Sequence, residues 1–132
     1  MAIRPIAHGL VLCEQVIIDQ RSQNPSLINC FTTRVEAVFP SPPRFWVVYT
    51  QLTDGVGSVK MDVVITRLNH GAVVFEKTTP VNFRDQLQVA HVVCRVQDFV
   101  VSAAGWYGVE LLADREFVAQ ARFEVVQRRT AQ

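Results

Sequence analysis

The segment GWYGVELLADREFVAQARFEV, residues 105–125, decides the fold class, because its apolar residues alternate with polar ones. Alternation with a period of two places successive side chains on opposite faces of a β-strand, whereas a helix needs apolar residues three and four apart. Asp114 and Arg115 interrupt the pattern. The segment therefore predicts a β-hairpin with strands over 106–113 and 116–126. Its apolar face comprises Tyr107, Val109, Leu111, Ala113, Phe117, Ala119, Ala121, Phe123 and Val125.

Outside this segment, the sequence predicts six further strands, at 9–18, 27–38, 44–52, 59–68, 72–78 and 87–96. Turn signals separate them, such as Asn24-Pro25, the prolines of 40–43 and Asn69-His70-Gly71. Asp19 and Asn24 are expected to serve as turn residues, whose side chains bond nearby backbone. About eight strands predict an all-β fold, a single immunoglobulin-like antiparallel sandwich. A closed or jelly-roll-like barrel is the alternative.

The composition fits one folded domain of this class. The chain has 132 residues, of which 49% are apolar and 19% charged, which excludes intrinsic disorder. We expect the sandwich to span 1–127, followed by a short polar tail at 128–132. Valines occur in adjacent pairs such as Val63-Val64, Val73-Val74 and Val92-Val93. A free sheet facing water does not carry apolar residues on both faces, so these pairs predict self-association by a face or an edge.

Charge and hydropathy bear on partners and location. The net charge is +1, and the basic pair Arg128-Arg129 is the longest basic run, so we expect no nucleic-acid partner. The start does not read as a signal peptide, and no stretch approaches the roughly 18 apolar residues of a membrane span. The chain is therefore expected to be cytoplasmic, with a protein partner or as a homo-oligomer.

The three cysteines are Cys13, Cys30 and Cys94, and we expect them to be reduced thiols. If the first two strand runs pair, Cys13 and Cys30 come close, and a disulfide or a shared metal is the alternative. Cys94 lies in an apolar face with Val92 and Val96, which is typical of a buried small hydrophobe.

One part of the chain resembles a known family. The stretch CEQVIIDQRSQNPSLIN, residues 13–29, is similar to the opening of an uncharacterised family of small bacterial proteins, in which a strand "C-(D/E)-x-V-I-x-D" precedes "x-P-S-L-I-N-x-F". Phe45, Leu52-Thr53-Asp54-Gly55 and the hairpin of 105–125 also match. The resemblance implies an immunoglobulin-like β-sandwich of unknown function. It implies no catalytic residues.

No catalytic constellation is visible, so we expect the chain not to be an enzyme and to need no cofactor or metal. His91 and Cys94 are three residues apart and point to opposite faces of a strand. The histidines have no ligand spacing, and nucleophile-elbow and phosphate-loop patterns are missing. The acidic residues are scattered, mostly on expected outer faces; they include Glu14, Glu36, Glu76, Glu110, Glu116 and Glu124.

The aromatic residues are the remaining lead. Trp46, Tyr49 and Trp106 are candidates for a ligand-stacking platform, although a packed core tryptophan is the commoner role in a sandwich. The preferred function is a non-enzymatic protein-interaction or structural domain that self-associates. The alternative is a small-ligand or carbohydrate-binding module that uses these aromatics. A third reading is an enzyme whose site assembles across loops.

Overall fold

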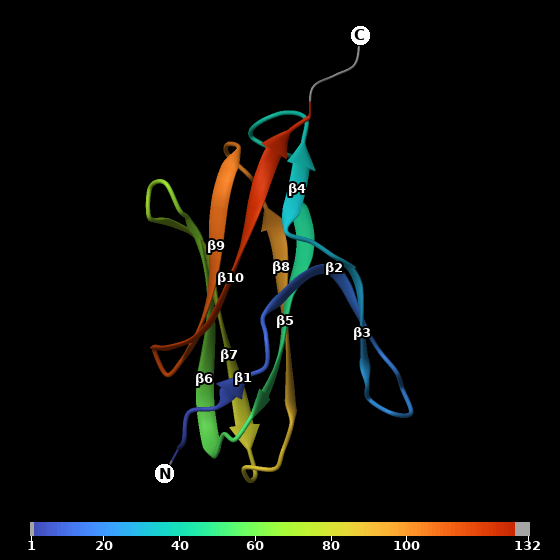
Figure 1. Cartoon of the computed structure of the whole chain (residues 1–132), viewed down its shortest axis with the longest axis vertical. Coiled ribbons are helices and arrows are strands. Elements are labelled where there is room, and N and C mark those ends of the chain that lie inside the picture. Colours follow the sequence, from blue (N-terminus) through green and yellow to red (C-terminus); the bar gives the residue numbers. More distant parts are fainter. Residues whose placement is uncertain (1, 129–132) are drawn as a thin grey trace.

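The chain folds into two β-sheets packed face to face, in a computed structural model that describes residues 2–128 (Figure 1). The first sheet contains β1 (Ile6–Ala7), β2 (Val11–Ile18), β3 (Pro25–Cys30), β5 (Arg44–Thr53) and β8 (Ala90–Phe99). The second has the order β4 (Thr33–Glu36), β10 (Glu116–Gln127), β9 (Gly105–Ala113), β6 (Gly57–Arg67) and β7 (Ala72–Phe83). Strands pair antiparallel except β4 with β10. The predicted all-β sandwich is confirmed.

The strand count is ten instead of about eight, for two reasons. A short strand, β1, pairs with the end of β5. The run predicted at 27–38 is two strands in different sheets: the backbone turns at Asn29, where φ is 54°, and crosses between the sheets. The Phe31 amide still donates to Leu12 of β2 (2.9 Å), whereas the next carbonyl, Thr32, accepts from Glu124 of β10 (2.9 Å).

Strand boundaries also differ on the edge strands. β7 runs past the predicted end at residue 78 and includes Pro80. A proline is tolerated there because the second sheet ends at β7, so one side of its backbone has no ladder bonds to make. β8 begins at Ala90 and not at Leu87, which is 92% exposed.

The core lies between the sheets and is centred on Trp46 of β5. Its indole packs edge-to-face against Phe31, Phe99 and Phe123, with ring centroids 5.2 to 5.5 Å apart. Cys94 is buried in this core, as predicted. The other side of the core comes from the predicted apolar face of β9, whose members Tyr107, Val109, Leu111 and Ala113 are all buried.

One residue of the predicted hairpin face is misplaced. Phe117 was expected to point inward with the other apolar residues of β10, but it is 53% exposed. The pairing of β10 with β9 shifts register between Phe117 and Ala119. A β-bulge of this kind reverses the alternation, so the residues before it face the opposite way.

At the chain's end, the Arg128 amide donates to the Glu36 carbonyl (2.9 Å). The rest of the predicted polar tail, 129–132, lies outside the described residues. Residues 2–128 contain no helix that is long and apolar enough to cross a membrane.

Candidate functional site

The β2–β3 hairpin stands away from the body of the sandwich. β2 pairs with β5 over Val11–Cys13 only, and its remaining residues pair with β3 alone. Within residues 2–128, β3 has no strand neighbour other than β2. Figure 1 shows the hairpin at the right, with its connecting loop extending beyond the two sheets. A two-stranded ribbon of this kind is marginally stable in water unless something packs on it.

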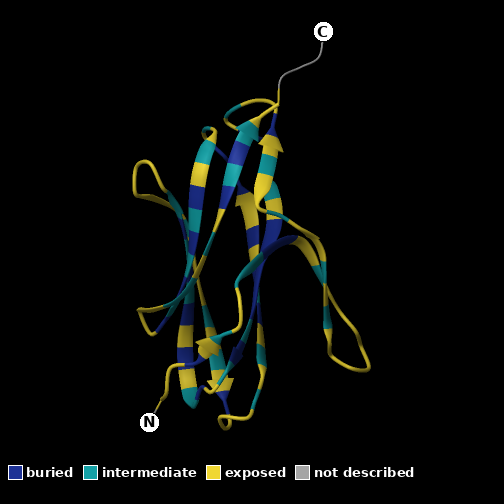
Figure 2. Ribbon diagram, in the orientation of Figure 1, coloured by how far each residue is buried: buried dark blue, intermediate teal, exposed yellow. Residues whose placement is uncertain are grey.

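The hairpin carries large aliphatic side chains on both of its faces. The register places Val16 opposite Leu27 on one face and Gln15 opposite Ile28 on the other. Ile17, Ile18 and Ile28 are 47%, 41% and 41% exposed, and we refer to these three residues as the hairpin patch. Figure 2 shows exposed and intermediate residues along the outer length of the hairpin. A cluster of exposed aliphatics on a projecting ribbon is typical of an interaction site.

The free edge of β3 is also unprotected. Cys13 and Cys30 are opposite each other, and the bond from the Phe31 amide to Leu12 shows that the neighbouring pair, Leu12 and Phe31, is hydrogen-bonded, so that the cysteine pair is not. Nearer the tip, the Asp19 amide donates to the Asn24 carbonyl (2.9 Å), so Ile17–Ser26 and Gln15–Ile28 are hydrogen-bonded pairs. The amide and carbonyl of Leu27, between them, therefore point away from β2. The sequence of β3, PSLINC, has no charged residue to discourage pairing with another strand.

The loop at the tip is held by Asp19, as predicted. Its carboxylate accepts hydrogen bonds from the Ser22 hydroxyl (2.7 Å) and from the amides of Ser22 (3.3 Å) and Arg21 (3.5 Å). The bonds from Ser22 lower the pKa of Asp19 below its ordinary value. Gln23, with φ of 62°, completes the turn. These contacts define the tip of the hairpin independently of the main body.

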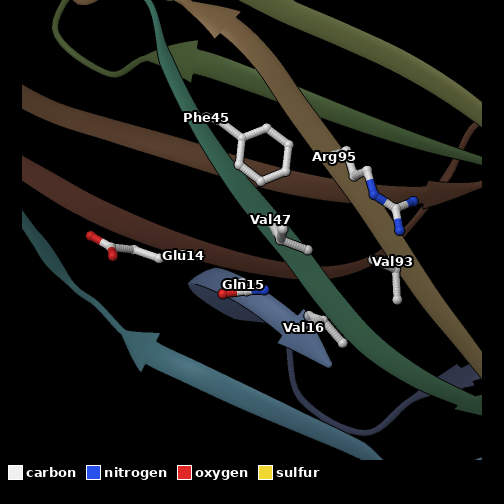
Figure 3. Close-up of a pocket in the computed structure, with 7 residues that line it drawn as sticks. All are labelled: Glu14, Gln15, Val16, Phe45, Val47, Val93 and Arg95. Carbon is white, nitrogen blue, oxygen red and sulfur yellow. The ribbon is translucent and has the colours of Figure 1, made fainter. Parts of the chain in front are cut away.

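A groove of about 370 Å³ lies where β2 leaves β5 (Figure 3). Its floor is Val47, which is buried although it lies on the face of the first sheet that is turned away from the core. Phe45, 47% exposed, stands beside it. The lining consists of Glu14, Gln15, Val16, Phe45, Val47, Val93 and Arg95. The groove thus continues the apolar surface of the hairpin onto β5 and β8.

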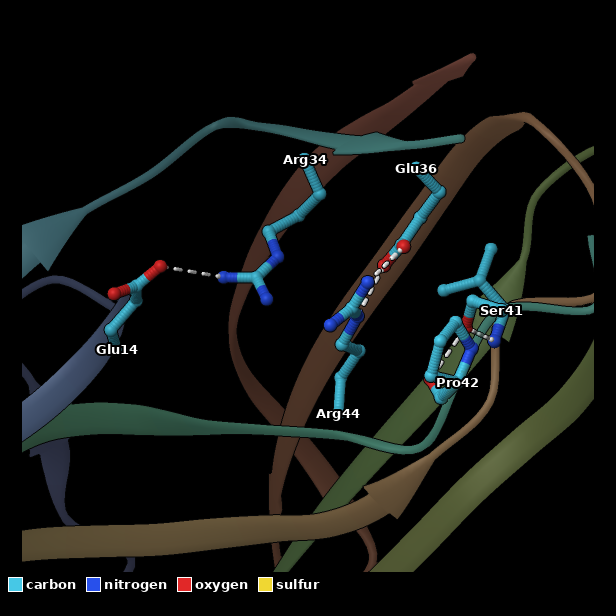
Figure 4. Close-up of polar contacts among 7 residues, drawn as sticks. Glu14, Arg34, Glu36, Ser41, Pro42 and Arg44 are labelled. Carbon is cyan, nitrogen blue, oxygen red and sulfur yellow. Dashed lines mark hydrogen bonds and ion pairs between the residues drawn. The ribbon is translucent and has the colours of Figure 1, made fainter. Parts of the chain in front are cut away.

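A polar cluster lies next to the hairpin where the chain crosses between the sheets (Figure 4). Arg34 of β4 lies 4.6 Å above the Phe31 ring and contacts Glu14 of β2 at 3.5 Å. Burial lowers the pKa of Arg34, while Glu14 and Glu36 act in the opposite direction. With one long ion pair and one aromatic contact, Arg34 ties β4 to β2.

The second ion pair of this cluster is shorter, and its carboxylate is buried. Arg44 donates from Nε (2.8 Å) and Nη2 (2.6 Å) to the two carboxylate oxygens of Glu36. These hydrogen bonds raise the pKa of Arg44 above its ordinary value. Glu36 is only 3% exposed, so the expectation that it lies on an outer face is wrong. The residue is buried because a bidentate partner satisfies its charge.

The three predicted ligand-binding aromatics do not come together. Trp46 is 1% exposed and belongs to the core. Tyr49 is 6% exposed on the outer face of the first sheet, where its hydroxyl is 2.6 Å from Nδ1 of His91. Trp106, 47% exposed, belongs to β9 of the second sheet. None of them lines the groove.

Sequence reasoning missed the hairpin as a site, although a signal for it was present. Val16-Ile17-Ile18 and Leu27-Ile28 are apolar without alternation, as expected of strands covered on both sides. The valine pairs predicted self-association without locating it on the hairpin. As to metals, no group of three or more His, Cys, Asp and Glu side chains gathers among residues 2–128.

No protein-family model matches the chain, and no curated protein matches its sequence. Among solved structures, an alkylpurine DNA glycosylase, AlkC of Pseudomonas fluorescens bound to DNA containing an abasic site analog, is 12% identical with a TM-score of 0.54. The match covers 92% of this chain and 30% of the glycosylase, so the chain spans less than a third of that protein. An immunoglobulin-like protein of Pseudomonas aeruginosa is 13% identical with a TM-score of 0.45, covering 94% of this chain and 98% of the other.

These likenesses concern the fold. One of the two neighbours is described as an immunoglobulin-like protein of a bacterium, and no family is shown for this chain. The prediction about partners is corrected on one point: we excluded nucleic acid from the net charge of +1, but the glycosylase containing a similar fold is bound to DNA. A near-neutral net charge is an average over the surface and does not exclude local phosphate contacts.

Proposed function

We propose that this chain is a non-enzymatic polypeptide-binding domain whose β2–β3 hairpin associates with the same hairpin of a second copy. The observation that carries the proposal is the exposure of Ile17, Ile18 and Ile28 on a ribbon with no other strand beside β3 in residues 2–128. We also propose that the chain belongs to the family of small bacterial proteins that its sequence resembles.

Strand pairing between two copies of β3 gives each hairpin a third neighbouring strand. Antiparallel pairing about a two-fold axis joins the outward amide and carbonyl of Leu27 to the same groups of the partner. The two first sheets then form one continuous sheet, and each hairpin shields apolar residues of the other. The absence of charge from the sequence of β3 favours a self-complementary edge of this kind.

The small-ligand alternative receives less support from the geometry. Its three aromatic residues belong to the core and to the outer faces of two different sheets, so they make no common stacking surface. The groove beside β2 is lined mainly by Phe45, Val47, Val93 and Val16, and it joins the hairpin patch. We therefore assign the groove to the same polypeptide interface.

Sedimentation over a wide range of protein concentration tests the proposal. The wild-type chain is expected to form dimers, and Ile28→Lys is expected to be monomeric because a lysine on β3 places charge at the pairing edge. Val73→Lys is the matched control, since Val73 is 57% exposed on β7 of the second sheet. A wild-type monomer at all concentrations overturns the proposal. So does tight binding of duplex DNA by the wild-type chain in place of self-association.

A further inference from the structure

Cys13 and Cys30 lie at the root of the hairpin, directly opposite each other on β2 and β3. Because the neighbouring pair of Leu12 and Phe31 is hydrogen-bonded, the cysteine pair is of the narrow type, in which the Cα atoms are about 4.5 Å apart. Disulfides span Cα separations of about 4.4–6.8 Å. The two side chains share one face of the ribbon, since residues opposite each other in a sheet point the same way. The backbone therefore already has a spacing that a disulfide accepts.

The two thiols differ in their access to solvent. Cys30 is exposed at the edge of the first sheet, whereas Cys13 is fully buried. The third cysteine, Cys94, is buried on β8 opposite Val48 and belongs to the core. β5 separates β8 from β2, so Cys94 is not a partner for either of the other two.

We propose that Cys13 and Cys30 are a redox-active dithiol, which closes to an intrachain disulfide by exchange with a small disulfide such as oxidised glutathione. The Cys30 thiolate attacks one sulfur of the small disulfide, and a glutathione thiolate leaves. The Cys13 thiolate then attacks the Cys30 sulfur of the mixed disulfide, and the second glutathione thiolate leaves. Two thiols become one disulfide, and the two electrons and two protons convert the small disulfide to two thiols.

The burial of Cys13 limits the rate of the second step, the attack of its thiolate on the mixed disulfide. Desolvation raises the pKa of Cys13, and a charge on Cys30 raises it further. Little of Cys13 is then thiolate at neutral pH, and closure of the mixed disulfide accelerates as the pH rises. The effect of Cys30 on the pKa of Cys13 is a further sign that the two sulfurs lie close together.

The disulfide restrains the β2–β3 hairpin, which pairs with the rest of the first sheet over Val11–Cys13 only. It joins β2 to β3 where β2 still pairs with β5, so opening of the hairpin no longer separates its strands at the root. We expect backbone amide exchange in the hairpin to slow by roughly 10- to 100-fold and the melting midpoint to rise by several degrees.

Incubation of the full chain with oxidised glutathione tests the proposal. Two of the three thiols are expected to be lost, without glutathione remaining attached and without dimers on a non-reducing gel. Trypsin cleaves after Arg21 and Arg34, so the peptides that contain Cys13 and Cys30 stay joined only if the disulfide has formed. A mixed disulfide that persists on Cys30, or two chains joined through Cys30, overturns the proposal.

Two variants serve as controls. Cys94→Ala is expected to lose both of its thiols, as in the wild-type pair, and Cys30→Ser to keep its two remaining thiols. Because Cys30 is exposed, its replacement leaves the hairpin patch in place. Self-association of Cys30→Ser can therefore be measured without disulfide chemistry, so failure of this proposal is distinguishable from failure of the proposed function.

Discussion

Lys77 of β7 donates from Nζ to the carbonyl oxygen of Arg95 on β8 (3.4 Å) and so links the edge strands of the two sheets. Lys77 is opposite the buried Val63, which places its side chain on the face turned toward the first sheet. An inward-pointing lysine on an edge strand discourages pairing with other chains, and Pro80 blunts the same strand further along. This edge of the sandwich carries a lysine and an internal proline, whereas β3 carries no charged residue and its one proline, Pro25, is the first residue of the strand.

Replacing Lys77 by methionine removes that protection. Lys77→Met is expected to scatter more light on storage at high concentration, because β7 and β8 then present edges without a charge between them. The free energy of unfolding should change by less than about 0.5 kcal/mol, as for most exposed positions. Lys60→Met, on the interior strand β6, is the control. Equal light scattering from the two variants would show that Lys77 does not guard the edge.

Gly55 follows β5 and lies against a buried ring. A Cβ added there would meet Cδ2 and Cε2 of Phe83 at 2.8 Å, and Phe83 is only 2% exposed. Gly55→Ala is therefore expected to destabilise the chain by about 1–3 kcal/mol in chemical denaturation, because the ring cannot move without disturbing the core. At Gly108, a Cβ would meet only the end of Leu68, which is 48% exposed and can rotate away. Gly108→Ala should cost less than about 1 kcal/mol; the reverse ranking would contradict this view of the core.

The sequence predicted the sandwich because alternation is a local property. The inner face of β9 was right residue by residue, since the pattern from Tyr107 to Ala113 needs no knowledge of the partner strand. The face of Phe117 was wrong, because a bulge is a property of two strands and leaves no mark in one. The crossing at Phe31 was missed for the same reason: both sides of it read as strand, and only pairing shows that they belong to different sheets.

The candidate site was predicted less well than the fold. The aromatics Trp46, Tyr49 and Trp106 were grouped by residue type, but strand order decides whether such residues meet, and that order was not readable. The hairpin patch depends on β2 leaving β5 after Cys13, which is again a pairing property. Glu36 could not be recognised as buried because its partner Arg44 lies eight residues away across a proline-rich loop.

Removal of Arg44 leaves the buried carboxylate of Glu36 without its bidentate partner. Arg44→Met is expected to destabilise the chain by about 2–3 kcal/mol, less than a fully enclosed pair because the Arg44 side chain is 40% exposed. The double variant Glu36→Met/Arg44→Met should recover part of the loss, since the uncompensated charge is gone.

Arg34→Met is the matched comparison for Arg44. Its ion pair with Glu14 is 3.5 Å long and Glu14 is 49% exposed, so the loss should stay below about 1 kcal/mol. Urea denaturation of the three variants measures these differences. Equal losses for Arg34→Met and Arg44→Met would show that burial of Glu36 does not matter.

The hairpin tip is expected to respond to acid through Asp19. The hydrogen bonds from Ser22 hold the folded-state pKa of Asp19 below its unfolded value of about 3.9. A depressed pKa means that the ionised carboxylate stabilises the folded tip; this contribution is present above about pH 4 and is lost as the pH falls through the folded pKa. The protection of the Ser22 and Arg21 amides, which donate to this carboxylate, relative to their intrinsic exchange rates should fall over that range. An NMR titration of Ser22→Ala should return the Asp19 pKa toward its ordinary value, whereas Gln20→Ala should leave it low. If both variants titrate like the wild type, the hydroxyl of Ser22 is not what holds the carboxylate ionised.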